Sequence, residues 1–242
     1  MPALLEVAGI SKSFRGLRAV HDASFDIAEG SINALIGPNG AGKTTIFNMV
    51  AGVYRPDSGS IAFDQKPIHG LRPDQVCAAG IGRTFQLVKP FAGLSVLDNV
   101  IVGALQREAG VPSARRYALA ILKKLKLDAK KNLPAASLTL PDRKRLEVAR
   151  ALATRPRLLL LDEVMAGLRP TECDEMVGVF RDLNRAGGLT ILLIEHVMRA
   201  VMALAQKVVV LHHGEIIARG SPAEVVRDAA VLECYLGEET EV

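Results

Sequence analysis

Hydrophobic positions in the first third of the chain come in short runs separated by turn sequences. Several runs alternate hydrophobic with polar residues, and the turns between them contain glycine or proline, as at residues 28–30 and 56–59. Alternation of this kind is typical of strands with one buried face. We therefore expect meandering strands, interrupted by one helix that begins near Lys43. The runs that predict these strands are residues 4–10, 23–30, 31–37 and 59–65.

The rest of the chain shows two further patterns. From about residue 88 to 154, hydrophobic residues recur at helical spacing, most clearly at 115–127 and 143–153, which predicts a helical subdomain. Continuous hydrophobic runs then alternate with helical stretches, as expected for buried parallel strands joined by crossover helices. These runs are residues 157–163, 189–195 and 207–213, and a short strand is expected at 215–220. The sequence thus predicts an α/β fold.

A glycine-rich segment follows the third predicted strand. It reads GPNGAGKTT and matches the G-x-x-x-x-G-K-[ST] pattern of phosphate-binding loops. Its glycines let adjacent N–H groups converge on phosphate oxygens, and the positive end of the next helix points at the same anion. Lys43 is expected to reach the β- and γ-phosphates, and the Thr44 hydroxyl to bind Mg²⁺. A glycine-rich turn without a ligand is the alternative, and the complete match argues against it. The residues expected to contact the nucleotide are Gly37, Pro38, Asn39, Gly40, Ala41, Gly42, Lys43, Thr44 and Thr45.

Acidic residues and a histidine end two of the later hydrophobic runs. Asp162 and Glu163 stand where a strand parallel to the third one would bring them beside the phosphate loop. Asp162 is expected to bind Mg²⁺, and Glu163 to orient or deprotonate a water that attacks the γ-phosphate. The alternative is that the two acids only cap the next helix. His196 ends another run and is a candidate γ-phosphate sensor, although a lone histidine is usually structural.

Composition narrows the classes of function. The chain has 242 residues, of which 49% are hydrophobic and 23% charged, enough to bury a large core. Its net charge of +4 comes from 30 basic residues interspersed among 26 acidic ones, and aromatic residues make up 4%, so no nucleic-acid partner is expected. The isolated Cys77, Cys173 and Cys234 predict neither disulfides nor a zinc site. No export signal or bilayer-spanning run is found, and we expect a cytoplasmic location.

With these motifs in place, the whole chain resembles the nucleotide-binding subunits of ATP-binding cassette (ABC) transporters. The resemblance identifies residues 37–44 as the Walker A motif, 158–162 as Walker B, Glu163 as the catalytic glutamate and His196 as the switch histidine. It implies one ABC ATPase domain over residues 1–242, with ATP and Mg²⁺ as the bound groups. The expected parts are a P-loop NTPase (RecA-like) core with a parallel sheet and an N-terminal antiparallel β subdomain at 1–87 and 155–242, and an inserted α-helical subdomain at about 88–154.

The resemblance also assigns two residues that no spacing rule indicates. Gln86, in the stretch Gly82-Arg-Thr-Phe-Gln86, corresponds to the glutamine that touches Mg²⁺ and moves with the membrane partner. Phe14 resembles the aromatic residue that stacks on adenine. A phenylalanine of the core or of a strand end is the alternative for Phe14.

Two stretches, at 80–105 and 214–239, are similar to ATPases of branched-chain amino-acid importers, in particular the larger of their two types. The implied function is hydrolysis of ATP to power uptake of branched-chain amino acids or related polar solutes such as amides or urea. The implied partners are a second ATPase subunit, identical or different, two transmembrane permease subunits and, indirectly, a periplasmic solute-binding protein. The implied place is the inner face of the plasma membrane. The alternative is a nucleotide-gated regulatory ATPase that is not coupled to transport.

The signature loop departs from the family pattern. That loop reads Leu-Ser-Gly-Gly-Gln or Leu-Ser-Tyr-Gly-Gln in the family and serves a partner's nucleotide. Thr139 can still offer a hydroxyl, but Pro141 has no N–H, and Asp142 adds a negative charge that is unfavourable unless it points away or caps the helix. We expect two unequal ATP sites if the chain pairs with a different ATPase. The residues at the signature positions are Leu138, Thr139, Leu140, Pro141 and Asp142.

Two charged positions near this loop carry further expectations. Arg169 stands in the dimer-facing loop after Glu163, where the family usually has Asn or Asp. An arginine there is able to pair with an acidic partner surface or a phosphate. Arg143 and Glu147 are spaced for an ion pair on one helix, which explains the basic helix as a solvated face.

Overall fold

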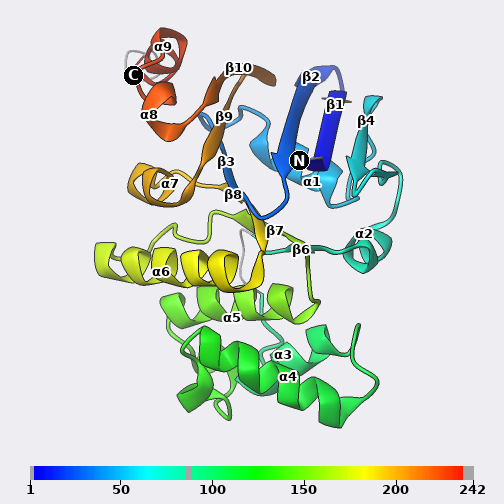
Figure 1. The fold of residues 1–242 in the computed structure, drawn as a ribbon, viewed down its shortest axis with the longest axis vertical. Coiled ribbons are helices and arrows are strands. Elements are labelled where there is room, and N and C mark those ends of the chain that lie inside the picture. The colour runs from blue at the N-terminus through cyan, green and yellow to red at the C-terminus, as the bar shows by residue number, and fades with distance from the viewer. Residues whose placement is uncertain (1–2, 86–88, 237–242) are drawn as a thin grey trace.

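The computed structural model describes residues 3–85 and 89–236, and two β-sheets form its centre (Figure 1). The strands are β1 (Ala3–Phe14), β2 (Leu17–Ala28), β3 (Ile32–Ile36), β4 (Ser58–Phe63), β5 (Lys66–Pro67), β6 (Ile81–Arg83), β7 (Leu158–Asp162), β8 (Thr190–Ile194), β9 (Lys207–His212) and β10 (Glu215–Gly220). An antiparallel sheet has the order β2-β1-β4-β5, and a larger sheet has the order β10-β9-β3-β8-β7-β6. Among the described strands of the larger sheet, β10 alone runs antiparallel to its neighbour.

The predicted strands all form, but one of them belongs to a different sheet. β3 lies between β8 and β9 in the parallel sheet, so the prediction that it continues the N-terminal meander was wrong. All five of its residues are buried, as in a strand that is covered on both faces. The later runs form β7, β8 and β9, and they run parallel to β3 or to each other as predicted.

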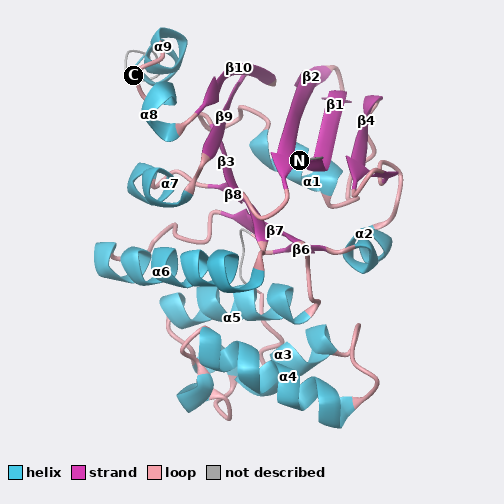
Figure 2. Ribbon diagram, in the orientation of Figure 1, coloured by secondary structure: helices cyan, strands magenta, loops and turns pink. Residues whose placement is uncertain are grey.

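Helices surround the larger sheet and form a separate layer below it in the view of Figure 2. They are α1 (Lys43–Val50), α2 (Pro73–Ala79), α3 (Val96–Ala104), α4 (Val111–Lys124), α5 (Leu140–Ala153), α6 (Pro170–Gly187), α7 (Met198–Leu204), α8 (Pro222–Val225) and α9 (Ala229–Leu236), with short 3₁₀ turns η1 (Asp128–Lys130) and η2 (Ala135–Ser137). The helix expected near Lys43 is confirmed as α1. α4 begins earlier than residue 115 because Pro112 suits a first turn, and it ends before Lys126, whose φ of 57° is left-handed.

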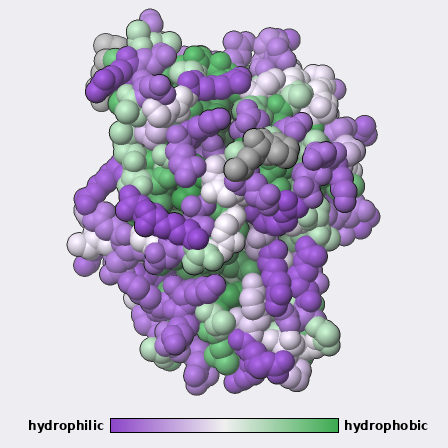
Figure 3. Space-filling model, viewed as in Figure 1, coloured by the Kyte–Doolittle hydropathy of each residue, from purple (hydrophilic) through white to green (hydrophobic). Residues whose placement is uncertain are grey.

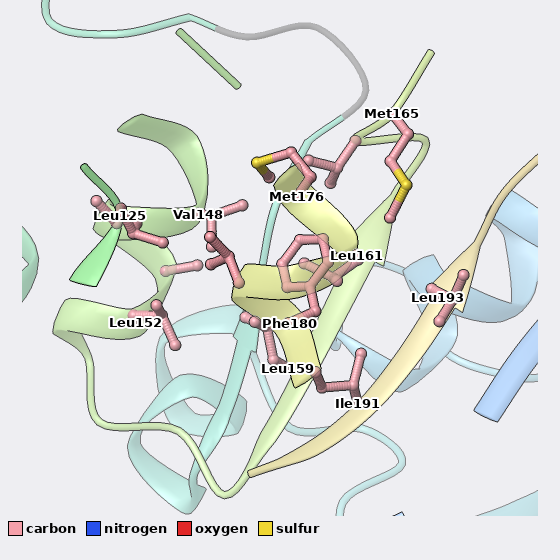
Figure 4. Close-up of a cluster of buried hydrophobic side chains, with 14 of the residues drawn as sticks. Leu125, Val148, Leu152, Leu159, Leu161, Met165, Met176, Phe180, Ile191 and Leu193 are labelled. Carbon is pink, nitrogen blue, oxygen red and sulfur yellow. The ribbon is translucent and has the colours of Figure 1, made fainter. Parts of the chain in front are cut away.

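Hydrophobic side chains pack on both faces of the parallel sheet. On one face α1 lies between the two sheets, and its Ile46 and Phe47 are buried among residues of both. On the other face, Figure 4 shows Val148 of α5 and Phe180 of α6 beside Leu159 of β7. Close packing on both faces holds the strands in place. The strand ends that carry the candidate residues are therefore fixed relative to one another.

The visible surface in Figure 3 is mainly hydrophilic, with hydrophobic residues in small separated patches. Within residues 3–85 and 89–236, none of the helices is long and apolar enough to cross a membrane. Cys77 and Cys173 are free thiols.

Candidate functional site

The loop between β3 and α1 depends on its glycines. Gly37, Gly40 and Gly42 have φ values of 146°, 79° and 101°, which favour glycine. A Cβ at Gly37 would lie 1.9 Å from the carbonyl oxygen of Leu211, and one at Gly42 would lie 2.3 Å from that of Ala19. The loop is thus tight against its neighbours, and the N-terminus of α1, with its partial positive charge, opens onto it.

Lys43 lies buried at the first position of α1. Its Nζ donates to the carbonyl oxygens of Gly37 and Pro38, both at 2.6 Å. Beside the loop is a cavity lined by residues 39–45, Ala19 and Glu163. Glu163 and the phosphate loop therefore share one cavity, as the sequence predicted.

Asp162 ends β7 and faces a second cavity that Thr44 also lines. Its Oδ2 accepts a hydrogen bond from Arg83 Nη2 at 2.9 Å, and Arg83 also donates to Asn48 Oδ1 at 2.6 Å. Its buried Oδ1 has no hydrogen-bond partner among the residues that the structure describes. Burial raises the pKa of Asp162, although the Arg83 guanidinium acts in the opposite direction. The unpartnered oxygen and the Thr44 hydroxyl are oxygen ligands of the type that Mg²⁺ prefers, so this site fits that ion.

Glu163 and His196 meet where β7 and β8 end. His196 Nε2 lies 2.8 Å from Glu163 Oε1, and the Glu163 side chain is 16% exposed. Glu163 has a φ of 49°, an uncommon conformation for a residue with a side chain. Its backbone N–H donates to the carbonyl of Ile194 at 2.9 Å. Neighbouring strands therefore hold this carboxylate at the rim of the phosphate cavity.

Two buried charged residues that the sequence reasoning missed support the segment after Glu163. Lys144 of α5 donates from Nζ to the Glu163 carbonyl at 2.9 Å, and Glu195 Oε1 accepts the N–H of Met165 at 2.8 Å. Glu195 Oε2 is buried and has no hydrogen-bond partner within residues 3–85 and 89–236. Burial raises the pKa of Glu195 to about 7, while the Met165 N–H and the Lys144 charge oppose this shift. No motif indicated these residues, and the position of Glu195 directly before His196 was the one available signal.

The signature positions lie between η2 and the first turn of α5. Leu138 is buried, Leu140 is 45% exposed, and Thr139 is the N-cap residue of α5. Pro141 sits in the first turn, where a missing N–H is tolerated. Asp142 is only 4% exposed, so its carboxylate turns into the protein. This is the inward orientation that the sequence allowed for a negative charge here.

The ion pair expected between Arg143 and Glu147 does not form among the described residues. Arg143 instead donates from Nε to the Leu138 carbonyl at 2.8 Å. Glu147 is buried, and Arg150 lies 3.3 Å from its Oε2. The prediction was wrong because Glu147 faces the interior, whereas Arg143 reaches back to the signature segment.

The remaining candidate residues are not among the described residues that line the two cavities. Phe14 lies near the tip of the β1–β2 hairpin, 36% exposed, with its ring centroid 5.1 Å from that of Tyr54. Its stacking on adenine stays a prediction. Gln86 lies outside the described residues. Arg169 is exposed and is the N-cap residue of α6.

Comparison with known families shows which family the chain belongs to. The family described as ABC transporter matches residues 20–166, more than half of the chain. The chain belongs to the ABC transporter family. A second family, described as branched-chain amino acid ATP-binding cassette transporter, matches residues 215–241 of this ABC protein.

Individual ABC proteins agree with the family match. The high-affinity branched-chain amino acid transport ATP-binding protein LivG of Salmonella typhimurium is 38% identical over 97% of this chain and 98% of its own. BraF of Pseudomonas aeruginosa, which has the same description, is 37% identical with the same coverage. A solved ATP-binding cassette of an ABC transporter in its ADP conformation has a TM-score of 0.89 and 30% identity, over 98% of this chain and 100% of that one. The predicted fold class is confirmed.

The family match also settles the type of activity. This ABC subunit binds and hydrolyses ATP to power transport. The alternative of a regulatory ATPase that is not coupled to transport is not favoured by any of these relatives.

Proposed function

We propose that this ABC subunit powers the uptake of branched-chain amino acids or related polar solutes. The match of residues 215–241 to the branched-chain amino acid family and the names of LivG and BraF support this cargo. The lipopolysaccharide export protein LptB of Acidithiobacillus ferridurans is 36% identical over the whole chain, so overall identity alone does not choose a cargo. The C-terminal match is therefore the more specific support.

The proposed grip on ATP uses the tight loop between β3 and α1. Backbone N–H groups of residues 39–45 and the N-terminus of α1 face the phosphates. Lys43 exchanges its contacts with the loop carbonyls for the β- and γ-phosphates, and Phe14 stacks on adenine. Thr44 and Asp162, with Gln86, are the proposed Mg²⁺ ligands, and the ion when bound neutralises charge on the phosphate oxygens.

The proposed base for hydrolysis is Glu163, because its carboxylate shares a cavity with the phosphate loop and is held by His196. This pairing is the observation that carries the mechanism. Water attacks the γ-phosphorus, the bond to the β–γ bridging oxygen breaks, and Glu163 accepts the proton of the water. His196 orients the Glu163 carboxylate and binds the γ-phosphate. The products are ADP and inorganic phosphate.

The proposed partners are a second ATPase subunit and two permease subunits at the inner face of the plasma membrane, with a periplasmic solute-binding protein delivering the cargo. The permease side fits a cavity of about 270 Å³ between α2, β6, α3 and α5. It is lined by apolar residues such as Val76 and Val102, with Arg150 at one side, 4.8 Å from the Phe91 ring. The lining also includes Arg83 and Glu147. A mainly apolar pocket with these charged groups suits a short helix that carries a hydrophobic anchor and polar side chains.

The catalytic proposal is tested with Glu163→Gln, which removes the base and keeps the size of the side chain. We expect calorimetry to show an unchanged affinity for ATP with Mg²⁺, and turnover to fall by about 100-fold or more. The exposed Glu233→Gln on α9 is the matched control and keeps normal turnover. Substantial hydrolysis by Glu163→Gln contradicts the role of this residue as base.

The cargo is tested by transport. The subunit is assembled with its permease chains and solute-binding protein in vesicles, with ATP on the cytoplasmic side. We expect saturable uptake of radiolabelled leucine, isoleucine and valine. Uptake of urea or short amides in place of these amino acids would replace the proposed cargo and leave the ATPase mechanism intact.

A further inference from the structure

The signature segment of this chain is engaged in a network of its own. The Thr139 hydroxyl donates to Asp142 Oδ2 at 2.8 Å, and Lys130 Nζ donates to the same oxygen. The guanidinium of Arg145 lies 3.9 Å from Asp142 Oδ1 and also contacts Glu175 of α6. The three partners of Asp142 come from η1, the N-cap of α5 and α5 itself, and Arg145 links them to Glu175 of α6. Asp142 is therefore the centre of a network that ties the signature segment to two neighbouring elements.

The network uses the donors that a signature loop would need for a phosphate. A hydroxyl has a single proton and can donate one hydrogen bond, and the Thr139 hydroxyl donates that bond to Asp142. Pro141 has no N–H, so the first turn of α5 presents one donor fewer than a helix with glycine at this position. The positive charge of Lys130 is matched by Asp142, and that of Arg145 is shared with Glu175. The segment has little free donor capacity or net positive charge left to attract a triphosphate.

The pKa of Asp142 agrees with this geometry. Burial acts to raise it, but the hydrogen bonds from Lys130 and Thr139 and the charges of Lys130 and Arg145 lower the pKa below its ordinary value. Asp142 is therefore ionised at neutral pH. An ionised carboxylate accepts hydrogen bonds and donates none, so it cannot replace the amide N–H₂ of the glutamine that the family has here.

We propose that the Asp142 network holds this signature segment in a form that closes weakly over a second chain's ATP. This inference rests on the proposed function. Where the second chain's signature loop has its donors free, the ATP on this chain's own phosphate loop is closed normally and turns over. The ATP on the partner's loop faces Thr139, Pro141 and Asp142 and turns over slowly.

The proposal has a direct consequence for the subunit alone. A pair of two identical copies would close both ATP molecules with the altered segment. The isolated chain is therefore expected to bind ATP as a monomer and to dimerise poorly. Restoring the donors should change this, because a hydrogen bond to a charged group is among the stronger polar contacts.

The test uses the full-length Glu163→Gln chain, so that ATP persists, with Mg²⁺ and saturating ATP. Light scattering after size exclusion measures the dimer. We expect the parent to remain monomeric and the additional triple change Thr139→Ser, Pro141→Gly and Asp142→Gln to strengthen dimerisation by about tenfold or more. A parent that dimerises as tightly as the triple variant overturns the proposal. Absence of dimer from both also overturns it, because the segment then does not limit assembly.

A pair of comparisons isolates the Thr139 hydroxyl. Thr139→Ala should leave dimerisation unchanged when Asp142 is present, because the hydroxyl is already engaged. In the Pro141→Gly, Asp142→Gln background the same change should weaken dimerisation by about tenfold, because the hydroxyl has been released toward the phosphate. Equal effects in both backgrounds contradict the network.

Two measurements distinguish failure of this proposal from failure of ATP binding and from unfolding. Calorimetry on each monomer reports ATP binding, so loss of binding in the parent counts against the proposed nucleotide site and not against the signature argument. Circular dichroism checks folding, since Asp142→Gln leaves Lys130 without its buried partner. Should the triple variant unfold, Pro141→Gly alone carries the comparison, because it changes no buried charge. In that case a gain in dimer supports the proposal and no gain opposes it.

Discussion

At the scale of single residues, the main feature is how many buried polar groups surround the Glu163 backbone. Lys144 reaches its carbonyl from α5, Ile194 accepts its N–H, and Glu195 holds the N–H of Met165 two residues further on. Buried charges are tolerated where they are hydrogen-bonded, and removing one partner leaves the other uncompensated. The left-handed conformation of Glu163 is thus maintained by contacts from α5 and from the end of β8.

Lys144 gives a test of this support. Lys144→Met keeps the aliphatic length and removes the hydrogen bond to the Glu163 carbonyl, so we expect the carboxylate to lose its fixed direction. Steady-state kinetics should show kcat lowered by about tenfold, with a much smaller change in KM for ATP. The exposed Lys124→Met on α4 is the control. A change confined to KM would mean that Lys144 acts on nucleotide binding and not on the base.

Glu195 makes stability depend on pH. Its pKa of about 7 in the folded chain exceeds the ordinary value of 4.5, so between these values the folded state holds a proton that the unfolded state has released. The free energy of unfolding therefore falls as pH rises through this window. The stability of Glu195→Gln does not fall in this way. Its free energy of unfolding, relative to that of the parent, should therefore increase by up to about 3 kcal/mol between pH 4.5 and 7. Urea unfolding at several pH values measures it.

The control for that experiment is Asp182→Asn on the exposed face of α6. It should follow the parent at every pH. A Glu195→Gln variant whose stability difference from the parent is the same at pH 5 and pH 8 would show that Glu195 is not protonated in the folded chain.

At the scale of elements, continuous hydrophobic runs predicted β7, β8 and β9 well because strands covered on both faces need no polar positions. The same pattern did not tell β3 from the N-terminal meander, since assignment to a sheet depends on contacts with β8 and β9, distant in sequence. β6 was missed for a different reason. It is three residues long, too short for a periodic signal, and it forms by pairing with β7.

The turn between β3 and α1 gives a prediction at this scale. Gly42→Ala places a Cβ 2.3 Å from the Ala19 carbonyl oxygen at a left-handed φ, so the loop must move. We expect a loss of roughly 3 kcal/mol in unfolding free energy together with loss of ATP binding. Gly40→Ala is the control, because its Cβ meets no atom of the described part of the chain within 4 Å, and only backbone strain of about 1 kcal/mol applies. Equal losses of unfolding free energy in both variants would contradict the expected clash between the new Cβ and the Ala19 carbonyl oxygen.

At the scale of the whole molecule, sequence motifs predicted part of the site but not all of its contacts. The loop with Lys43, the acidic pair and His196 follow from short patterns at strand ends, and the fold brings Glu163 to the loop and to His196. Arg83, which binds Asp162, was not predictable because the contact joins two strands that are far apart in sequence. The orientation of Asp142 also required the structure, since the sequence left open whether its charge faced a phosphate or the interior.

The cavity between α2, α3 and α5 connects the site to the proposed permease, because Arg83 and Glu147 line it and the Asp162 cavity alike. Val102 of α3 lies in its wall and is 46% exposed. Val102→Arg adds a bulky cation next to Arg150, so we expect permease-stimulated ATP turnover and uptake to fall by about tenfold. ATP turnover of the isolated subunit should stay normal, because Val102 lies outside both phosphate cavities. Val111→Arg is the matched control, because Val111 is also exposed, at 57%, but lies outside this cavity. Should both variants transport normally, the permease binds elsewhere; should both lose transport, added charge alone explains the effect.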